Sequence, residues 1–310
     1  MNKILLTGGS GFLGRFVYNE LISRGFSFND IYIVRSKDYD LTDIYAVKKL
    51  YKDIQPSIVV HLAAEVGGIG ANMANPGRYF YSNMSMGLNL IECGRICGID
   101  KFVQIGTVCA YPKICSVPFV EEDIWNGYPE ETNAPYGVAK KALFVMLDAY
   151  KKQYGLNSAV LVPCNLYGPH DNFNPISSHV IPALIKKFYE AKIGGNKEVC
   201  CWGDGSATRE FLFIQDAAVA IVNSLSMIDD PSPINLGGGQ EISIKDLAEK
   251  IGRFVGYEGN IVWDESKPNG QPRRFLNITK AEKLLAWTPK KNLDAGLKET
   301  IEWYIGESNQ

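Results

Sequence analysis

The sequence predicts an α/β protein with a doubly wound parallel sheet and a smaller C-terminal lobe. Short apolar runs alternate with longer amphipathic segments through the first 165 residues, which is the pattern of strands and helices in a parallel sheet. A glycine-rich turn directly follows the first apolar run. Beyond Asn165 the alternation loosens and Gly and Pro become frequent, so a second, less regular unit is expected there.

Each short apolar run predicts a strand, and each longer periodic segment predicts a helix. Strands are expected at 3–7, 30–34, 58–63, 101–107 and 158–163, with helices at 14–24, 44–53, 76–97 and 136–154. Further elements are expected at 178–192 and 244–255. The segments 210–227 and 234–236 are expected to return to the first unit. The predicted domains are therefore 1–165 with 212–238, and 166–211 with 239–310.

Composition excludes several classes of partner. The chain of 310 residues has 46% hydrophobic residues, and 32 Lys and Arg against 34 Asp and Glu, with no basic block. This balance predicts no nucleic-acid partner and no anionic membrane partner. No apolar run reaches the length of a membrane span. Met1-Asn2-Lys3 leads directly into the first predicted strand, so no signal peptide is expected.

The seven cysteines indicate a reducing compartment. They are scattered, with no C-x-x-C pair, which predicts free thiols, most of them buried, and a cytoplasmic location. The three histidines do not cluster with them, so no metal site is expected.

The glycine-rich turn, Gly8-x-x-Gly11-x-x-Gly14, predicts a dinucleotide site of the Rossmann type. Gly8 would allow a tight turn after the strand, Gly11 would let the backbone approach a pyrophosphate, and Gly14 would let the helix pack on the sheet. The helix N-terminus would attract the anion.

The end of the second predicted strand indicates which dinucleotide binds. No carboxylate stands there for a ribose 2′-hydroxyl, whereas Arg35-Ser36-Lys37 follows the strand and suits a 2′-phosphate. NADP(H) is therefore predicted. The alternative is that Arg35 stacks on the adenine and Lys37 is merely exposed, with Asp40 and Leu41 contacting the adenine.

Tyr136-x-x-x-Lys140 predicts acid–base chemistry at a carbinol or ketone. At this spacing both side chains lie on one face of a helix, so the ammonium is expected to lower the pKa of the phenol. Thr107 ends a predicted strand and is placed to offer a hydroxyl beside Tyr136. Cys109 follows by two positions and is expected on the same side of an extended segment. The alternative for the pair is a solvated helix face with a half-buried aromatic.

These motifs resemble the extended short-chain dehydrogenase/reductases, and within them the GDP-L-fucose synthase family. The likeness covers essentially the whole chain. Besides the glycine turn and the Tyr-Lys pair, it rests on segments 61–69, 109–113, 163–169, 178–184, 202–205, 209–212 and 267–270.

The resemblance implies three reactions on GDP-4-keto-6-deoxy-D-mannose, namely epimerisation at C3, epimerisation at C5 and reduction at C4 by NADPH. Cys109 would be the base and His179 the acid of the epimerisations. Tyr136 would protonate the C4 oxygen, Lys140 would tune Tyr136 and hold the nicotinamide ribose, and Thr107 would orient the ketone. The alternatives are a packing role for His179 and an inert buried thiol at Cys109.

The resemblance also implies binding residues and a dimer. Substrate contacts would come from Lys187, Trp202, Arg209 and Asn269, with Arg209 as the diphosphate partner and a core aromatic as the alternative for Trp202. A homodimer would form through a four-helix contact of segments 76–97 and 136–154. Cofactor contacts would come from Gly8, Gly11, Phe12, Leu13, Gly14, Arg35, Asp40, Leu41, Leu62, Ala63, Ala64, Lys140, Pro163, Asn165 and Leu166.

Departures from the family pattern leave the exact sugar open. Thr107-Val108 stands in place of a serine pair, Ala110 in place of isoleucine, Glu65 in place of lysine and Asn269 in place of aspartate. A related enzyme that acts on another GDP-4-keto sugar, or that only epimerises or only reduces, remains an alternative. So do an epimerase that retains NAD and a non-catalytic NADP-binding protein.

Overall fold

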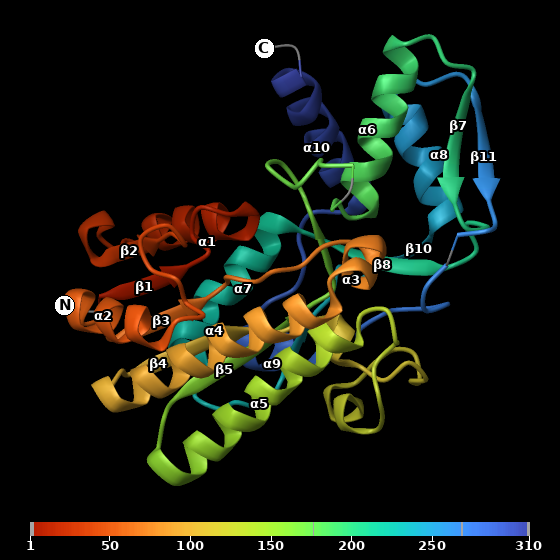
Figure 1. Cartoon of the computed structure of the whole chain (residues 1–310). Helices are drawn as coiled ribbons and strands as arrows, with labels where there is room; N and C mark the ends of the chain where they lie inside the picture. Colours follow the sequence, from red (N-terminus) through yellow and green to blue (C-terminus); the bar gives the residue numbers. More distant parts are fainter. Residues whose placement is uncertain (1–2, 176, 268, 309–310) are drawn as a thin grey trace.

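A six-stranded parallel sheet forms the centre of the molecule, in the strand order β2-β1-β3-β4-β5-β9 (Figure 1). The computed structural model describes residues 3–175, 177–267 and 269–308, so Met1, Asn2 and Pro268 of the predicted segments lie outside it. The doubly wound sheet predicted from the sequence is confirmed. Its strands are β1 (Ile4–Thr7), β2 (Ile31–Val34), β3 (Ile58–His61), β4 (Lys101–Ile105), β5 (Ser158–Pro163) and β9 (Ile234–Leu236).

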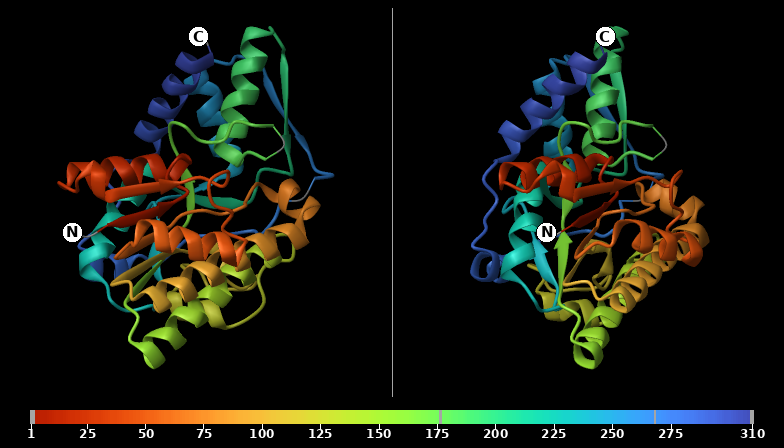
Figure 2. Two further views of the ribbon diagram at one scale, coloured as in Figure 1. Left: turned by 60° about the vertical axis from the view of Figure 1, so that its left-hand side comes forward. Right: turned by 90° about the vertical axis from the view of Figure 1, so that its left-hand side faces the viewer.

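Helices cover both faces of this sheet (Figure 2). On one face α1 (Phe12–Ser23) packs against α7 (Ile214–Met227). On the other face lie α2 (Ile44–Ile54), α4 (Pro76–Cys97) and α5 (Ala134–Tyr154). The strand order reverses between β1 and β3, and ligands of such sheets bind beyond the carboxyl ends of the strands at this reversal.

Several element boundaries differ from the prediction. Helix α1 begins at Phe12 rather than at Gly14, and α5 begins at Ala134 with Pro135 in its first turn. Proline is compatible with this position because the first turn leaves its N–H groups unpaired. Strand β3 ends at His61 and β4 at Ile105, so the residues beyond them are free to form loops.

The smaller lobe has its own sheets and core. Buried apolar side chains such as Ile185, Phe188 and Leu247 form a second cluster, apart from the one around the central sheet. In Figure 1 this lobe lies at the upper right. Its elements are β6 (Asn165–Tyr167), β7 (Glu198–Trp202), β8 (Thr208–Phe213), β10 (Glu241–Ser243), β11 (Asn260–Asp264), α6 (Val180–Ile193), α8 (Ile244–Val255) and α10 (Leu293–Ser308). Helix α3 (Ile69–Ala74) precedes α4, and α9 (Thr279–Leu285) packs on α7.

One expected segment is divided between the two cores. Segment 210–227 was expected to return to the first unit as a whole, but its first residues belong to β8, which pairs with β6 and β10. Only α7 and β9 return to the central sheet. Leu212 is buried in the first core and Phe213 in the second, because successive strand residues point to opposite faces.

Among the described residues, no helix is long and apolar enough to cross a membrane. All seven cysteines are free, as predicted. Only Cys93, Cys164 and Cys201 are buried, so the expectation that most of them are buried is wrong.

Candidate functional site

The glycine turn lies at the carboxyl end of β1 and is too crowded for larger residues. Gly8 has a φ of +69°, and a methyl group there would lie 2.8 Å from the backbone nitrogen of Ala63. A methyl group at Gly14 would lie 2.2 Å from the carbonyl oxygen of Gly8. These contacts match the tight turn and the close helix packing expected of the two glycines. Gly11 is the N-cap of α1.

A pocket of about 520 Å³ adjoins this turn and brings two arginines together. Arg35 lines it, and Arg15, which the motifs did not single out, faces the same space. Neither arginine forms an ion pair with another residue that the structure describes. The other lining residues are Gly9, Ser10, Phe16, Tyr18, Asn19, Ile33 and His170.

The other residues predicted around the adenine are placed differently. Lys37 is exposed and does not line the pocket. Asp40 caps a turn, accepting hydrogen bonds from the backbone and hydroxyl of Thr42 at 2.9 and 2.7 Å, and these bonds lower the pKa of its carboxyl. Leu41 is buried in the first core. Only Arg35 of the four side chains therefore faces the pocket.

The remaining predicted cofactor contacts gather along the carboxyl ends of the strands. They open α1, follow β3, or lie where β5 passes into β6: Phe12, Leu13, Leu62, Ala63, Ala64, Pro163, Asn165 and Leu166.

Tyr136 and Lys140 lie one turn apart on α5 and are both buried. The Thr107 hydroxyl lies near enough to the Tyr136 phenol to lower its pKa. Burial and the neighbouring Cys109 raise the pKa of Tyr136, and the effect of Thr107 offsets this only in part. Burial lowers the pKa of Lys140 to about 8. The net pKa shift of Tyr136 is therefore upward and not downward as predicted, because desolvation dominates. A phenol that stays protonated suits a proton donor.

Cys109 lies beside this pair, but in a turn. Residues Val108–Ala110 form a 3-10 helix, in which the Thr107 Oγ1 accepts a hydrogen bond from the Cys109 N–H at 3.1 Å. The expected extended segment is therefore wrong, because the Thr107 side chain caps a helical turn. A methyl group at Gly137 would lie 2.1 Å from the carbonyl oxygen of Cys109. The glycine after Tyr136 thus lets the turn pack directly on α5.

His179 is the exposed N-cap of α6, which does not favour the packing alternative. The surrounding protein still desolvates the ring enough to lower the pKa of His179. The loop after β3 contacts the segment just before His179, since Gly68 N donates to the Ser177 carbonyl at 3.3 Å. A methyl group at Gly68 would lie 2.8 Å from the Ser178 carbonyl oxygen. The double glycine therefore brings the β3 loop and the His179 segment together.

Glu65, one of the departures from the family pattern, is engaged by α4. Arg78 donates to both of its carboxylate oxygens, at 2.7 and 3.0 Å.

The predicted substrate residues lie around β7, β8 and the segment after β11. Arg209 is 9% exposed, and its guanidinium donates to the carbonyls of Thr208 at 2.7 Å and of Asn269 at 3.1 Å. Burial, and then the nearby cation of Arg274, lower the pKa of Arg209 to about 10. A buried arginine of this kind, with no carboxylate partner in the described chain, is suited to bind an anion.

Trp202 and Lys187 lie close by. Trp202 ends β7 with 55% of its surface exposed, which excludes the core-aromatic alternative. The ammonium of Lys267 lies 5.6 Å from its ring centre. Lys187 donates to the Cys200 carbonyl at 2.6 Å, and this bond ties α6 to β7.

Sequence reasoning missed Arg274 and Gln271. The guanidinium of Arg274 donates to the sulfur of Cys109 at 3.8 Å and to the Gln271 Oε1 at 2.8 Å. Arg274 and Cys109 are 165 positions apart in the sequence, which explains why no local motif connects them.

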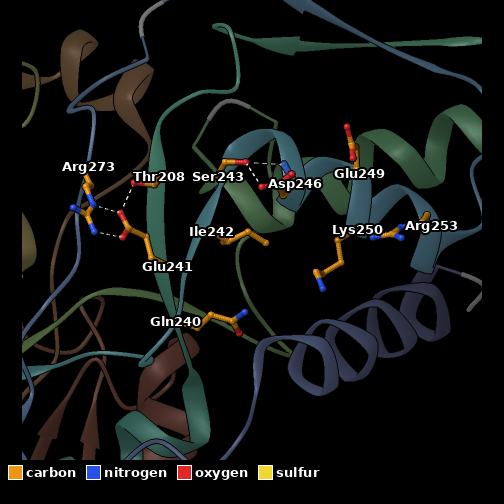
Figure 3. A pocket seen from close by; sticks show the side chains of 10 residues that line it. All are labelled: Thr208, Gln240, Glu241, Ile242, Ser243, Asp246, Glu249, Lys250, Arg253 and Arg273. Atoms are coloured by element: carbon orange, nitrogen blue, oxygen red, sulfur yellow. Dashed lines mark hydrogen bonds and ion pairs between the residues drawn. The ribbon is translucent and has the colours of Figure 1, made fainter.

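A second pocket, of about 560 Å³, lies between β10 and α8 (Figure 3). Two of its cations are already paired: Arg273 with Glu241 at 2.7 Å, and Lys250 with Asp294 at 2.6 Å. None of the predicted catalytic side chains lines it. This pocket is therefore separate from the site around Tyr136. No group of three or more His, Cys, Asp or Glu that could hold a metal occurs in the described chain.

Comparison with known proteins places this geometry in a family. Residues 4–237 match the model of the NAD dependent epimerase/dehydratase family. The chain belongs to this family. It is 38% identical over 304 residues to the probable GDP-L-fucose synthase 1 of Oryza sativa subsp. japonica, covering 98% of this chain and 92% of the relative. It is 35% identical over 311 residues to the GDP-L-colitose synthase of Yersinia pseudotuberculosis, covering 99% of each.

Solved structures of similar enzymes have the same fold as this chain. A GDP-6-OMe-4-keto-L-xylo-heptose reductase from C. jejuni superimposes with a TM-score of 0.93 at 30% identity, over 99% of this chain and 98% of the other. A GDP-L-fucose synthetase from Naegleria fowleri bound to NADP superimposes with a TM-score of 0.88 at 30% identity, over 100% and 94%. The family predicted from the sequence motifs is confirmed.

Proposed function

We propose that this chain converts GDP-4-keto-6-deoxy-D-mannose into GDP-L-fucose, by inverting C3 and C5 and then reducing C4 with NADPH. The observation that carries the proposal is the placement of Cys109 beside Thr107 and Tyr136. Cys109, as a base that removes a proton from carbon, and Tyr136, as a proton donor to oxygen, can then act on the same ketone. A C4 ketone acidifies the hydrogens at both C3 and C5, so one site acts on both centres.

In the epimerisations, Cys109 takes a proton from one face of the sugar and His179 returns one to the other. The C–H bond breaks, its electron pair passes into an enolate, and an S–H bond forms. His179 then gives a proton to the same carbon from the opposite face. Exchange with solvent restores both side chains.

Reduction follows on the inverted ketone. The cofactor supplies hydride to C4 when it is bound. Tyr136 gives its proton to the C4 oxygen, and Thr107 orients that oxygen through its hydroxyl. Burial keeps the phenol protonated by raising its pKa, which suits the donor role.

The residues present fit NADP(H). The Gly8 turn and the start of α1 suit the pyrophosphate, and Arg35 with Arg15 suits a 2′-phosphate. Lys140 is buried, and its ammonium forms no hydrogen bond with a described residue, which leaves it for the nicotinamide ribose. In this proposal, residues 1–165 and 212–238 bind the cofactor, and 166–211 and 239–310 bind the nucleotide sugar. Arg209 pairs with the diphosphate, with Lys187, Trp202 and Asn269 around it.

We also propose a homodimer in the cytoplasm. Helices α4 and α5 pack side by side and carry exposed apolar side chains, including Tyr81, Leu88 and Val145. A second copy would cover these side chains in a four-helix contact. The free thiols support a reducing compartment.

The experiment is incubation of the purified protein with NADPH and GDP-4-keto-6-deoxy-D-mannose, with identification of the sugar product by NMR. GDP-L-fucose is expected. A product reduced without inversion would favour a C4 reductase, as the similarity to the C. jejuni reductase also allows. Tightly bound NAD in the purified protein would instead favour an epimerase that oxidises C4 transiently. No turnover of any GDP-4-keto sugar would favour the non-catalytic alternative.

A further inference from the structure

Arg274 places a buried positive charge beside the sulfur of Cys109. It is 9% exposed and forms no ion pair within the described chain. A buried guanidinium is costly unless hydrogen bonds and an opposing charge compensate it. Its Nη1 donates to the Cys109 Sγ at 3.8 Å. The sulfur is therefore the group that this cation faces.

The guanidinium is held in that direction by its own surroundings. Its Nε donates to the Oε1 of Gln271 at 2.8 Å. Gln271 is itself buried and donates to the carbonyls of Lys113 at 2.9 Å and of Pro112 at 3.4 Å. These carbonyls belong to the segment that directly follows the Cys109 turn. Because Gln271 joins the two segments, the charge and the sulfur are fixed relative to each other.

The preceding residue provides a built-in contrast. Arg273 is exposed, and both ends of its guanidinium pair with the carboxylate of Glu241 (Figure 3). Two successive arginines thus have different tasks. Arg273 closes a surface ion pair, whereas Arg274 enters the cluster around Cys109.

We propose that Arg274 is a positioning residue for Cys109, a role that rests on the proposed function because it serves a sulfur that abstracts a proton. The guanidinium compensates the negative charge of the thiolate and aims the sulfur at one face of the sugar. When the thiolate takes the proton, the C–H bond breaks, its electron pair enters the enolate and the S–H bond forms. The negative charge then leaves the sulfur for the C4 oxygen, and Arg274 keeps the thiol in place.

The competing role for Arg274 is to bind the substrate diphosphate together with Arg209. The two cations are close enough for Arg274 to lower the pKa of Arg209. A phosphate ligand acts on substrate affinity, whereas a positioning residue acts on the reactivity of the thiol with or without substrate. The two roles therefore predict different measurements.

The first measurement uses the full chain without substrate. Iodoacetamide alkylates thiolates, and mass spectrometry of the peptide that contains Cys109 separates this thiol from the other six. At pH 7, Arg274→Gln is expected to slow alkylation of Cys109 by roughly tenfold, because a charged hydrogen bond to the thiolate is lost. Arg274→Lys should restore part of the rate. Arg273→Gln, the matched control, should leave it unchanged.

The second measurement is exchange of solvent deuterium into C3 and C5 of the keto sugar at saturating concentration. Arg274→Gln should lower this rate by a similar factor, with KM changed by less than about threefold. An unchanged alkylation rate would overturn the proposal. So would a raised KM with normal exchange at saturation, which would identify a phosphate ligand.

If Arg274→Gln does not fold, Gln271→Leu provides the same test, because it keeps the cation and removes the group that aims it. It should slow alkylation of Cys109 in the same direction, and a normal rate would overturn the proposal. A wild-type protein without any exchange would reject the proposed function. The substrate-free alkylation would still decide the role of Arg274.

Discussion

The side chains proposed for reduction and those proposed for epimerisation are held in different ways. Tyr136 and Lys140 lie within α5, and Thr107 follows β4, all packed on the central sheet. Cys109 lies in a 3-10 turn and His179 at a helix N-cap. Arg274 contacts Cys109, and the Gly68 loop contacts the segment before His179; both come from distant parts of the chain. Groups on regular elements are placed more precisely than groups on loops, so we expect the reductive half to be the more rigid.

The largest expected effect comes from Tyr136→Phe, which separates the two halves. Without the phenol, the C4 oxygen loses its proton donor, so kcat for reduction should fall by a factor on the order of 10² or more. Solvent deuterium should still enter the keto sugar at C3 or C5. Steady-state NADPH oxidation and mass spectrometry of the sugar measure the two steps. Reduction at a near-normal rate would refute the donor role.

The converse change targets the epimerisation half. Cys109→Ser should abolish deuterium entry, because no proton leaves the sugar, while some direct reduction of the unepimerised ketone remains. His179→Gln should allow partial exchange at the original face with little inverted product, since the enolate forms but its protonation from the other face is lost. NMR of the recovered sugars distinguishes these outcomes. Normal epimerisation by Cys109→Ser would leave the thiol with only a packing role.

The buried ammonium of Lys140 is expected to lower the free energy of unfolding, and a substitution at this position tests that expectation. Burial lowers the pKa of Lys140 from 10.5 to about 8, so below about pH 8 the folded chain keeps a disfavoured buried ammonium. Between these two values the unfolded chain binds more protons, and stability rises with pH. Lys140→Met removes the charge and should stabilise the cofactor-free protein at pH 7 by up to about 3 kcal/mol, while abolishing reduction.

Thermal unfolding of both proteins across pH 7 to 10.5 measures this effect. The advantage of Lys140→Met should shrink as the pH rises, because the wild-type lysine loses its proton. An advantage that does not change with pH would mean that packing, and not charge, separates the two proteins.

The difference between the two halves also determines what the sequence could predict. The glycine turn, the six parallel strands and the Tyr136–Lys140 spacing are local patterns, and their geometry follows from helix and strand periodicity. The turn at Cys109 forms because the Thr107 hydroxyl accepts a hydrogen bond from the Cys109 N–H, which favours the turn over an extended backbone. The sequence pattern did not predict this turn. Gly137 offered a signal, because a glycine inside a helix beside a reactive tyrosine indicates close backbone contact.

The remaining misses are effects of tertiary structure. The spacing of Tyr136 and Lys140 predicted an electrostatic pair, but the depth of burial reverses the direction of the phenol's pKa shift. Arg274 reaches Cys109 because the segment after β11 pairs with the start of β8, where Arg274 N donates to the Thr208 carbonyl at 3.3 Å. Such long-range pairing leaves no periodic trace in either segment.

The smallest expected effect concerns the cofactor, at the edge of the reductive half. Arg35 and Arg15 line the pocket beside the glycine turn without carboxylate partners in the described chain, so both should favour a 2′-phosphate. The wild type should prefer NADPH over NADH in kcat/KM. Arg35→Ala and Arg15→Ala should each narrow this preference by roughly tenfold through weaker NADPH binding, with NADH little affected.

Lys37→Ala is the matched control, because Lys37 is exposed and does not line this pocket. Equal efficiency of the two cofactors with the wild type would refute the electrostatic argument. A large loss from Lys37→Ala with none from Arg15→Ala would instead restore the pairing of Arg35 and Lys37 that the sequence alone suggested.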